Sequence, residues 1–193
     1  MIRYRVRCLS ALDPHELRTR YAHIPSEYRL HPPERATPIR MASELLLREL
    51  LTEQTGGTFD GFRFFRTESG KPYAERSPEF NLSHSGEWIL CAVGDTPLGA
   101  DIEAARNVSP ALMRRVCTAA ELAFIDGDPN RFLQLWTAKE AYLKYRGTGI
   151  VGDLRRVETV RDGEIAIPSV KLLRENTDAY TLTIACAYKD ERL

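Results

Sequence analysis

The sequence predicts an α+β fold made of two pseudo-equivalent α/β halves, residues 1–96 and 97–193, related by a pseudo-twofold duplication. Two observations support this fold class. The same order of elements, a strand followed by helices and then three strands, occurs twice with no long linker between the copies. In addition, 43% of the residues are apolar, which is enough to form a core. Active sites often form where two halves meet, so the duplication predicts an active site in the groove between them.

The elements of the first half follow from their periodicity and their end signals. Residues 2–8 alternate apolar side chains with arginines, which is the period of a half-buried strand. Asp13-Pro14 is a cap and first-turn pair that predicts a helix to about Leu30. A leucine-rich stripe predicts a second helix over 35–54, ending before Gly56-Gly57. Strands are predicted over 61–66, 79–83 and 87–93, with a turn at 68–72 between the first two.

The second half repeats this order. Residues 98–103 predict a strand, and 109–124 predict helical turns that include the capping box Thr118-x-x-Glu121. The segment 131–146 predicts a largely buried helix, because apolar residues cover most of its surface before the break at Gly147-Thr148-Gly149. Three further strands are predicted, over 153–160, 164–173 and 179–188.

Charge and cysteine usage narrow the class of protein. Lys plus Arg and Asp plus Glu both number 27, so there is no broad positive field to bind nucleic acid or an anionic membrane. The first residues alternate in charge and contain no long apolar run, from which we expect no signal peptide, no membrane span and a cytoplasmic location. The cysteines are widely spaced in apolar segments, which predicts reduced core residues: Cys8, Cys91, Cys117 and Cys186.

Three carboxylates suggest a cation site. Asp101 and Glu103 are two residues apart on a predicted strand, so their side chains point the same way. Glu140 could add a third carboxylate if the long helix packs over this strand. Carboxylate oxygens suit Mg²⁺, and one Mg²⁺ held in this way suits phosphoryl-type chemistry. An acidic pair at a strand end is more often simply solvated, and Glu140 with Lys144, one turn apart, can be an ordinary surface pair.

A second group of residues suggests phosphate binding. Ser83 and His84 lie where a strand is predicted to end in a tight turn, and they can present a hydroxyl and an imidazole to a phosphate. Lys71 lies between Gly70 and Pro72 and has little backbone freedom to lose on contacting an anion. The ordinary alternative is a set of exposed turns whose side chains bond their own loops. The combination of motifs is more specific than any single one.

Four motifs in this order and spacing resemble the Sfp-type 4′-phosphopantetheinyl transferases: Gly70–Pro72, Phe80–Gly86, Gly99–Glu103, and Trp136–Lys144 followed by Gly-x-Gly. The resemblance implies Mg²⁺-dependent transfer of the 4′-phosphopantetheine arm from coenzyme A to a serine of an apo acyl or peptidyl carrier protein, with release of 3′,5′-ADP. A shorter, trimeric class of the same superfamily has one half per chain. The two halves here therefore imply a monomer.

The resemblance also implies roles for single residues. Asp101, Glu103 and Glu140 would bind the metal. Glu140 would also be the base that deprotonates the carrier serine, and Lys144 would neutralise the pyrophosphate and assist the departing phosphate. Further contacts to the phosphates of coenzyme A would come from basic and hydroxyl residues, namely Arg66, Lys71, Ser83 and His84, with Arg29, Arg35 and Arg40 as candidates ahead of the second helix.

The carrier protein would dock after Glu103, according to the same resemblance. An apolar stripe of Val108, Leu112, Met113 and Val116 could receive a helix of the carrier, although the same stripe would also suit the core. The sequence does not indicate whether the carrier serves fatty acid, polyketide or nonribosomal peptide synthesis, or whether acylated coenzyme A is accepted.

Two other classes of function remain open at this point. A Mg²⁺-dependent exonuclease can also place Asp-x-Glu on a strand, but it would need further aspartates and a basic groove. A catalytically silent module that binds carrier proteins would share the fold, yet Asp101, Glu103, Glu140 and Lys144 are all present.

Overall fold

The computed structural model describes residues 1–68, 70–148 and 154–188. The chain divides into two compact units, Met1–Pro97 and Leu98–Leu193, and each has its own three-stranded antiparallel sheet and long helix. In each unit the first strand pairs with the last strand, which pairs in turn with the strand before it. The pseudo-twofold relation and the groove stay predictions. Ser69, Gly149 and Asp153, which belong to predicted turns or strands, lie outside the described residues.

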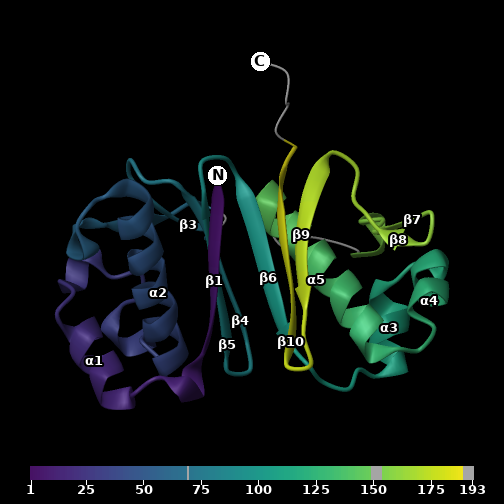
Figure 1. Ribbon diagram of the computed structural model, residues 1–193, viewed down its shortest axis with the longest axis horizontal. Coiled ribbons are helices and arrows are strands. Elements are labelled where there is room, and N and C mark those ends of the chain that lie inside the picture. Colours follow the sequence, from purple (N-terminus) through teal and green to yellow (C-terminus); the bar gives the residue numbers. More distant parts are fainter. Residues whose placement is uncertain (69, 149–153, 189–193) are drawn as a thin grey trace. The chain divides into compact units, whose positions relative to one another are not determined.

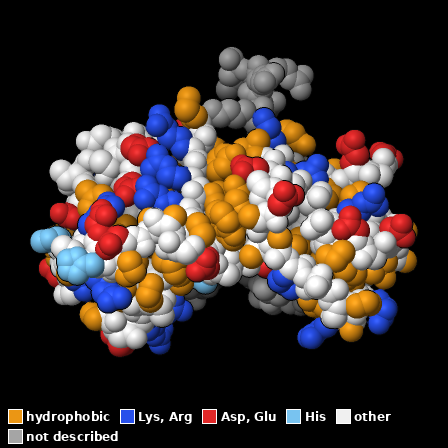
Figure 2. Space-filling model, turned by 60° about the horizontal axis from the view of Figure 1, so that its bottom comes forward, with side chains coloured by type: hydrophobic (Ala, Val, Ile, Leu, Met, Phe, Trp, Pro, Cys, Tyr) orange, Lys and Arg blue, Asp and Glu red, His pale blue; other side chains and the backbone are white. Residues whose placement is uncertain are grey.

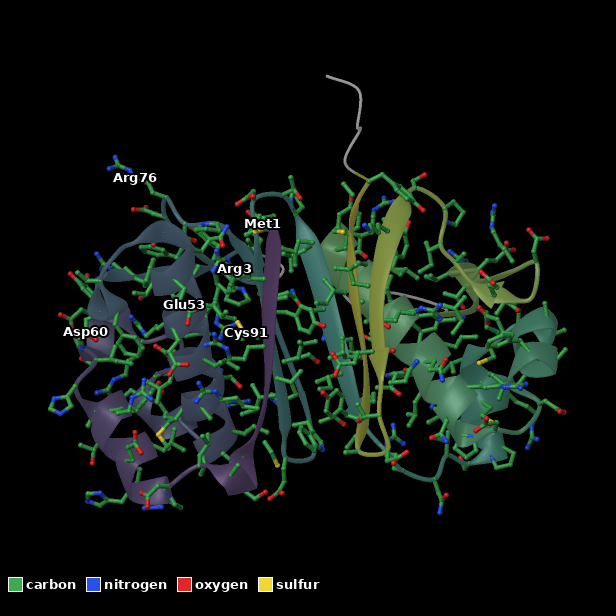
Figure 3. All side chains as sticks on the ribbon, viewed as in Figure 1. Met1, Arg3, Glu53, Asp60, Arg76 and Cys91 are labelled. Atoms are coloured by element: carbon green, nitrogen blue, oxygen red, sulfur yellow. The ribbon has the colours of Figure 1, made fainter. Side chains whose placement is uncertain are left out.

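The first unit consists of a sheet in the order β1-β5-β4 with helices on one face. Its strands are β1 (Ile2–Cys8), β4 (Glu79–Ser85) and the central β5 (Trp88–Gly94), on which Cys91 lies (Figure 3). Helix α2 (Pro38–Thr55) packs on β5, and α1 (Pro14–Ala22) packs on α2 (Figure 1). The small hairpin of β2 (Phe64–Arg66) and β3 (Pro72–Ala74) completes the unit.

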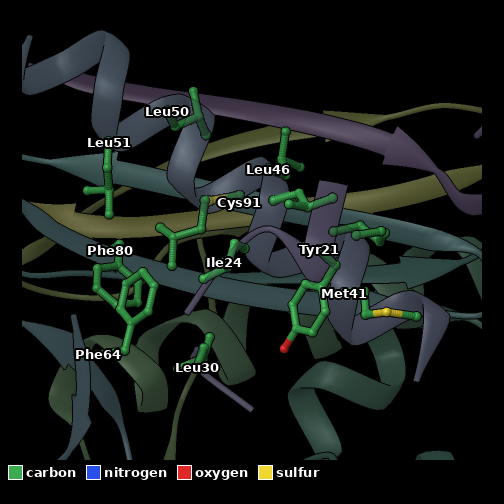
Figure 4. Close-up of a cluster of buried hydrophobic side chains, with 14 of the residues drawn as sticks. Tyr21, Ile24, Leu30, Met41, Leu46, Leu50, Leu51, Phe64, Phe80 and Cys91 are labelled. Atoms are coloured by element: carbon green, nitrogen blue, oxygen red, sulfur yellow. The ribbon is translucent and has the colours of Figure 1, made fainter. Parts of the chain in front are cut away.

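The core of this unit forms between α2 and the sheet. Leu46, Leu50 and Leu51 of α2 are 0–1% exposed and contact side chains of β5 such as Cys91 (Figure 4). The leucine stripe that predicts this helix is therefore its buried face. Helix α2 ends where Gly56 adopts a left-handed φ of 69°, as the glycine pair predicts.

The second unit has a sheet in the order β6-β10-β9, formed by β6 (Leu98–Ala104), β9 (Val170–Asn176) and β10 (Tyr180–Ala187). Helix α5 (Pro129–Arg146) packs across β6 and β10, with α3 (Pro110–Val116) and α4 (Ala119–Ile125) on its other side (Figure 1). The capping box of Thr118 and Glu121 is confirmed. The strands β7 (Val160–Arg161) and β8 (Glu164–Ile165) form a short hairpin.

Several element boundaries differ from the prediction, and short 3-10 helices account for part of the difference. The first helix stops at Ala22 rather than Leu30, because Pro25 follows and a separate turn begins at Ser26. The predicted strand over 153–160 is wrong over 154–156, where the chain is a 3-10 helix. The strand predicted over 164–173 is broken at 166–169. The 3-10 helices are Leu9–Ala11, Ser26–Tyr28, Pro33–Arg35, Phe59–Gly61 and Leu154–Arg156.

The apolar stripe proposed as a carrier-docking surface belongs to the second core. Val108, Met113 and Val116 are 8%, 4% and 6% exposed and pack with buried residues of α5 such as Phe132. Leu112 alone of the four is half-buried. A short helix gains most of its stability by burying its apolar face. The stripe is thus used for folding, and the structure does not support it as a surface for a partner.

The surface agrees with the balanced composition. On the face drawn in Figure 2, acidic and basic side chains are interspersed within each unit. Surface pairs such as Arg5 with Glu53, at 3.1 Å, contribute to this mixture (Figure 3 labels Glu53). No helix among the described residues combines the length and the apolar character needed to cross a bilayer.

Candidate functional site

A cavity of about 480 Å³ in the first unit gathers basic side chains from separate parts of the chain. Three arginines and two histidines line it, whereas no acidic residue does so among the described residues. Such a cavity attracts anions, because arginine guanidinium groups match the geometry of phosphate oxygens. The lining residues are Leu30, His31, Pro32, Arg35, Arg40, Ser43, Arg66, Pro72, Leu82 and His84.

Strand alternation decides which residues of the Phe80–Gly86 motif reach this cavity. Strand β4 continues through Ser85, so His84 lies on the strand and not in the predicted turn. Leu82 and His84 both line the cavity, as expected for positions two apart on one strand. Ser83 faces the other way, is 8% exposed and does not line the cavity. The turn itself begins at Gly86, whose φ is 56°.

The pKa of His31 is lowered by its position in this cavity. His31 has a pKa lowered to about 4, first because burial disfavours the imidazolium and second because Arg66, Arg40 and His84 add positive charge. His31 is therefore held neutral among charged neighbours. An anion entering the cavity would reverse the electrostatic part of this effect.

The structure separates the basic residues predicted to bind phosphates. Arg35, Arg40 and Arg66 come together with His84 around the cavity. Lys71 does not line it and instead lies 3.3 Å from Glu79 Oε2. Arg29 does not line it either, because its guanidinium donates to the carbonyls of Ile24 and Ala22 near the end of α1.

Sequence reasoning missed two polar residues of this cavity, His31 and Ser43. His31 is followed by Pro32-Pro33, which stiffen the segment, and this was the available signal. Ser43 lies one turn after Arg40 on α2. A hydroxyl beside apolar helix positions gives no comparable signal, since serine also occurs in ordinary helices.

A second group of functional side chains lies in the second unit, where β6 crosses α5 closely. A Cβ atom on Gly99 would overlap the carbonyl oxygen of Ala141 and the amide nitrogen of Tyr145. Only glycine allows the strand to approach the helix backbone in this way. The close approach brings Asp101 next to Lys144, with 2.6 Å between Oδ1 and Nζ. Lys144 Nζ also donates to the carbonyl oxygen of Ala100, at 3.0 Å.

Glu140 is a buried carboxylate of this group with a raised pKa. It is 7% exposed, and its pKa is raised to about 7, first by burial and then by the negative charges of Asp101 and Glu103, while Lys144 lowers it. Its Oε1 is buried and receives no hydrogen bond from the part of the chain that the structure describes. The three predicted metal ligands thus act on one another electrostatically, which places them around a common region of the second unit.

These carboxylates fit a divalent cation in their chemistry. Hard oxygen donors and a buried carboxylate oxygen without a hydrogen bond are features that Mg²⁺ would satisfy. The described residues nevertheless contain no set of three acidic, histidine or cysteine side chains already close enough to hold an ion. The ammonium of Lys144 offsets part of the negative charge at Asp101 instead.

Lys139, next to Glu140 in the sequence, has a structural role that the sequence analysis did not predict. It is 0% exposed, and its Nζ lies 2.8 Å from Glu121 Oε2 and also donates to the carbonyls of Val116 and Leu154. This buried pair fastens α3, α4 and the 3-10 helix at Leu154 to α5. These contacts hold α5, the helix that carries Glu140, against α3 and α4.

Comparison with known families covers both units. Residues 97–185 match the profile of the 4′-phosphopantetheinyl transferase superfamily, and residues 34–95 match that of the 4′-phosphopantetheinyl transferase N-terminal region. The chain belongs to the 4′-phosphopantetheinyl transferase superfamily. The family resemblance inferred from the four motifs is confirmed.

Curated relatives within this superfamily include three from Bacillus. The 4′-phosphopantetheinyl transferase Sfp of Bacillus subtilis is 28% identical over 166 residues, which is 78% of this chain and 74% of the relative. Psf-1 of Bacillus pumilus is 34% identical over 117 residues, covering 57% of this chain and 50% of the relative. The transferase ffp of Bacillus subtilis is 30% identical over 152 residues, covering 74% and 66%. The chain thus spans from half to three quarters of the length of these phosphopantetheinyl transferases.

Proposed function

We propose that this chain transfers 4′-phosphopantetheine from coenzyme A to a serine of an apo carrier protein, releasing 3′,5′-ADP. The observation that supports it best is the close approach of β6 to α5, which places Asp101 2.6 Å from Lys144 beside the buried carboxylate of Glu140, whose pKa is raised, within the region that matches the superfamily profile. A perturbed carboxylate beside a lysine suits proton abstraction and charge stabilisation.

The cavity of the first unit would bind phosphates of coenzyme A. Arg35, Arg40 and Arg66 supply fixed positive charge, and His31 and His84 supply imidazole donors. Guanidinium groups bind phosphate through paired, charge-assisted hydrogen bonds. Lys71 and Ser83 do not line this cavity, so contacts from these two residues stay predictions that the geometry of the cavity does not support.

The chemical step would use Glu140 and Lys144. Glu140 accepts the proton of the carrier serine hydroxyl as the serine oxygen bonds to the β-phosphorus of coenzyme A. The bond from that phosphorus to the bridging oxygen breaks, and the electron pair leaves with 3′,5′-ADP. The ammonium of Lys144 stabilises the negative charge that develops on the phosphate oxygens. Each product then carries one of the two phosphates of the former pyrophosphate.

Asp101, Glu103 and Glu140 would hold a Mg²⁺ ion. When bound, the ion would offset negative charge on the pyrophosphate as a Lewis acid. Glu103 lies two residues from Asp101 on β6 and is half-buried, so it reaches the same side of the strand. The pairing of Lys144 with Asp101 keeps the strand carboxylate near the helix.

The experiment that tests this function is intact-protein mass spectrometry of an apo acyl carrier protein and an apo peptidyl carrier domain. Each is incubated with this chain, coenzyme A and Mg²⁺. The expected result is a gain of one phosphopantetheine mass that disappears when Mg²⁺ is chelated. If neither carrier gains mass, calorimetry with coenzyme A separates the two remaining explanations: a narrow-specificity transferase still binds coenzyme A, whereas a silent homologue with a lost site does not.

Family membership argues against the exonuclease alternative, because the matched profiles and the curated relatives are all phosphopantetheinyl transferases. Release of nucleotides from DNA or RNA by this chain would support the exonuclease alternative. The monomeric state, the cytoplasmic location and the choice of carrier belong to the proposal as well, and the two carrier proteins in the mass measurement begin to rank the carriers.

A further inference from the structure

The peptide of Leu30 is held from both sides at the edge of the basic cavity. Its N–H donates to Glu44 Oε2 at 2.9 Å, and its carbonyl oxygen lies 3.5 Å from Nη2 of Arg66. The next residue, His31, has its carbonyl oxygen 3.2 Å from the hydroxyl of Tyr21, which is also 3.1 Å from Glu44 Oε2. Movement of this peptide would therefore displace His31 and Arg66 together.

We propose that Glu44 is a positioning residue for phosphate binding, acting through the Leu30 peptide on His31 and Arg66. Glu44 does not itself line the cavity. The proposal rests on the proposed function, in which this cavity takes the phosphates of coenzyme A.

Burial makes the geometry around Glu44 rigid. Glu44 and Arg48 are both 0% exposed and are 3.0 Å apart, one helical turn from each other on α2. Arg48 also donates to the carbonyls of Tyr28 and Phe59, at 2.6 and 3.1 Å. Any rearrangement would leave a buried charge without its partner, which is strongly destabilising. The segment from Tyr28 to His31 is thus tied to α2.

The direction in which Glu44 points also preserves the positive charge of the cavity. Ser43 lines the cavity, whereas Glu44, rotated by about 100° around the helix, turns into the core and neutralises Arg48. Tyr21 and Leu30, whose polar atoms contact Glu44, belong to the buried hydrophobic cluster of the first unit that Figure 4 draws. The Glu44 carboxylate therefore pairs with Arg48 in the core and does not neutralise the cavity arginines Arg35, Arg40 and Arg66.

Two variants and one matched control test the proposal. Glu44→Gln removes the charge, and Tyr21→Phe removes only the hydroxyl near His31. Glu49→Gln is the control, because Glu49 also lies on α2 and pairs with Arg7 and Arg20, at 2.8 and 2.9 Å, but does not line the cavity. Calorimetry with coenzyme A gives the dissociation constant, and the stoichiometry gives the folded fraction of each variant.

We expect the dissociation constant for coenzyme A to rise about tenfold in Glu44→Gln and about threefold in Tyr21→Phe, the effect of losing one to two hydrogen bonds that fix the site. In the transfer assay, KM for coenzyme A rises while kcat changes little, which a merely structural role would not produce. Glu49→Gln binds coenzyme A as the unchanged chain does, even where its stability falls.

Unchanged affinity for coenzyme A in folded Tyr21→Phe and Glu44→Gln would overturn the proposal and leave the proposed function intact. If Glu44→Gln does not fold, Tyr21→Phe decides by itself, because it leaves no charge unpaired. An equal loss of affinity in Glu49→Gln also counts against the proposal. If the unchanged chain fails to bind coenzyme A, the proposed function fails first, and that result is recognisable without any variant.

Discussion

Lys144 Nζ lies 2.6 Å from Asp101 Oδ1, so the last turns of α5 are joined to β6 by a charged pair directly beside Glu140. The pair keeps a cation among the three predicted metal ligands. Its geometry depends on the glycine at position 99, which lets the strand approach the helix backbone.

Asp101→Ala should raise the Mg²⁺ concentration needed for half-maximal transfer by about tenfold or more, because one of the three proposed oxygen ligands would be lost. The measurement is a Mg²⁺ titration of the initial rate of carrier modification. Asp178→Ala is the matched control, since Asp178 is exposed in a turn before β10. A titration curve for Asp101→Ala that coincides with that of the control would show that Asp101 is not a ligand.

Glu140→Gln should lower the transfer rate by about 100-fold or more, the usual contribution of a general base. The free energy of unfolding should stay the same or rise, because an amide replaces a buried carboxylate whose pKa is raised by burial and by Asp101 and Glu103. Mass spectrometry gives the rate, and urea denaturation gives the stability.

The control for this variant is Glu164→Gln, which changes an exposed glutamate on β8. Normal transfer by Glu140→Gln would remove the assigned role. A large loss of stability would instead show that the carboxylate is a core contact and not a functional group.

Gly99→Ala should destabilise the second unit by several kcal/mol, about 3 or more, because the added methyl group would overlap backbone atoms of Ala141 and Tyr145. Transfer should be lost as well, since Asp101 moves away from Lys144. Gly56→Ala is an informative comparison. Gly56 has open space around it and a φ of 69°, so that change costs only about 1 kcal/mol of backbone strain. Thermal unfolding that ranks the two variants in the opposite order would contradict the close approach of β6 to α5.

Short-range sequence signals correctly predicted one helix start, one helix end and the buried face of one helix. The capping box at Thr118, the glycine after α5 and the leucine face of α2 each act within one or two helical turns, and each is confirmed. The strand predicted over 153–160 was wrong over 154–156 because its apolar residues Leu154 and Val157 alternate weakly with arginines, and a 3-10 turn competes with a strand of this length.

The candidate site was predictable in part, from one residue of the Phe80–Gly86 motif and from arginines that the family resemblance marked as candidates. Arg35, Arg40, Arg66 and His84 reach one cavity. Lys71 also belongs to a motif but lies 3.3 Å from Glu79 Oε2, a contact that the motif does not indicate. The buried pair of Glu44 and Arg48 has a sequence signal, two opposite charges one turn apart among leucines, but the pattern alone does not distinguish it from a surface pair.

His31 makes the stability of the chain depend on pH, because its pKa is lowered to about 4 in the folded protein, against about 6.5 for an exposed histidine. Between these two values the unfolded chain binds more protons than the folded one. The contribution of a neutral His31 to stability is thus complete above about pH 6.5 and is lost as the pH falls towards 4.

The measurement compares the free energy of unfolding of the unchanged chain and of His31→Asn at about pH 7 and about pH 5. The unchanged chain should lose more stability than the variant on acidification. Coenzyme A should reduce this difference, because its phosphates offset the charges of Arg66 and Arg40 and raise the pKa of His31, an increase that NMR titration of the imidazole detects. If the pKa of His31 does not rise when coenzyme A is bound, the phosphates lie elsewhere and the basic cavity is not their site.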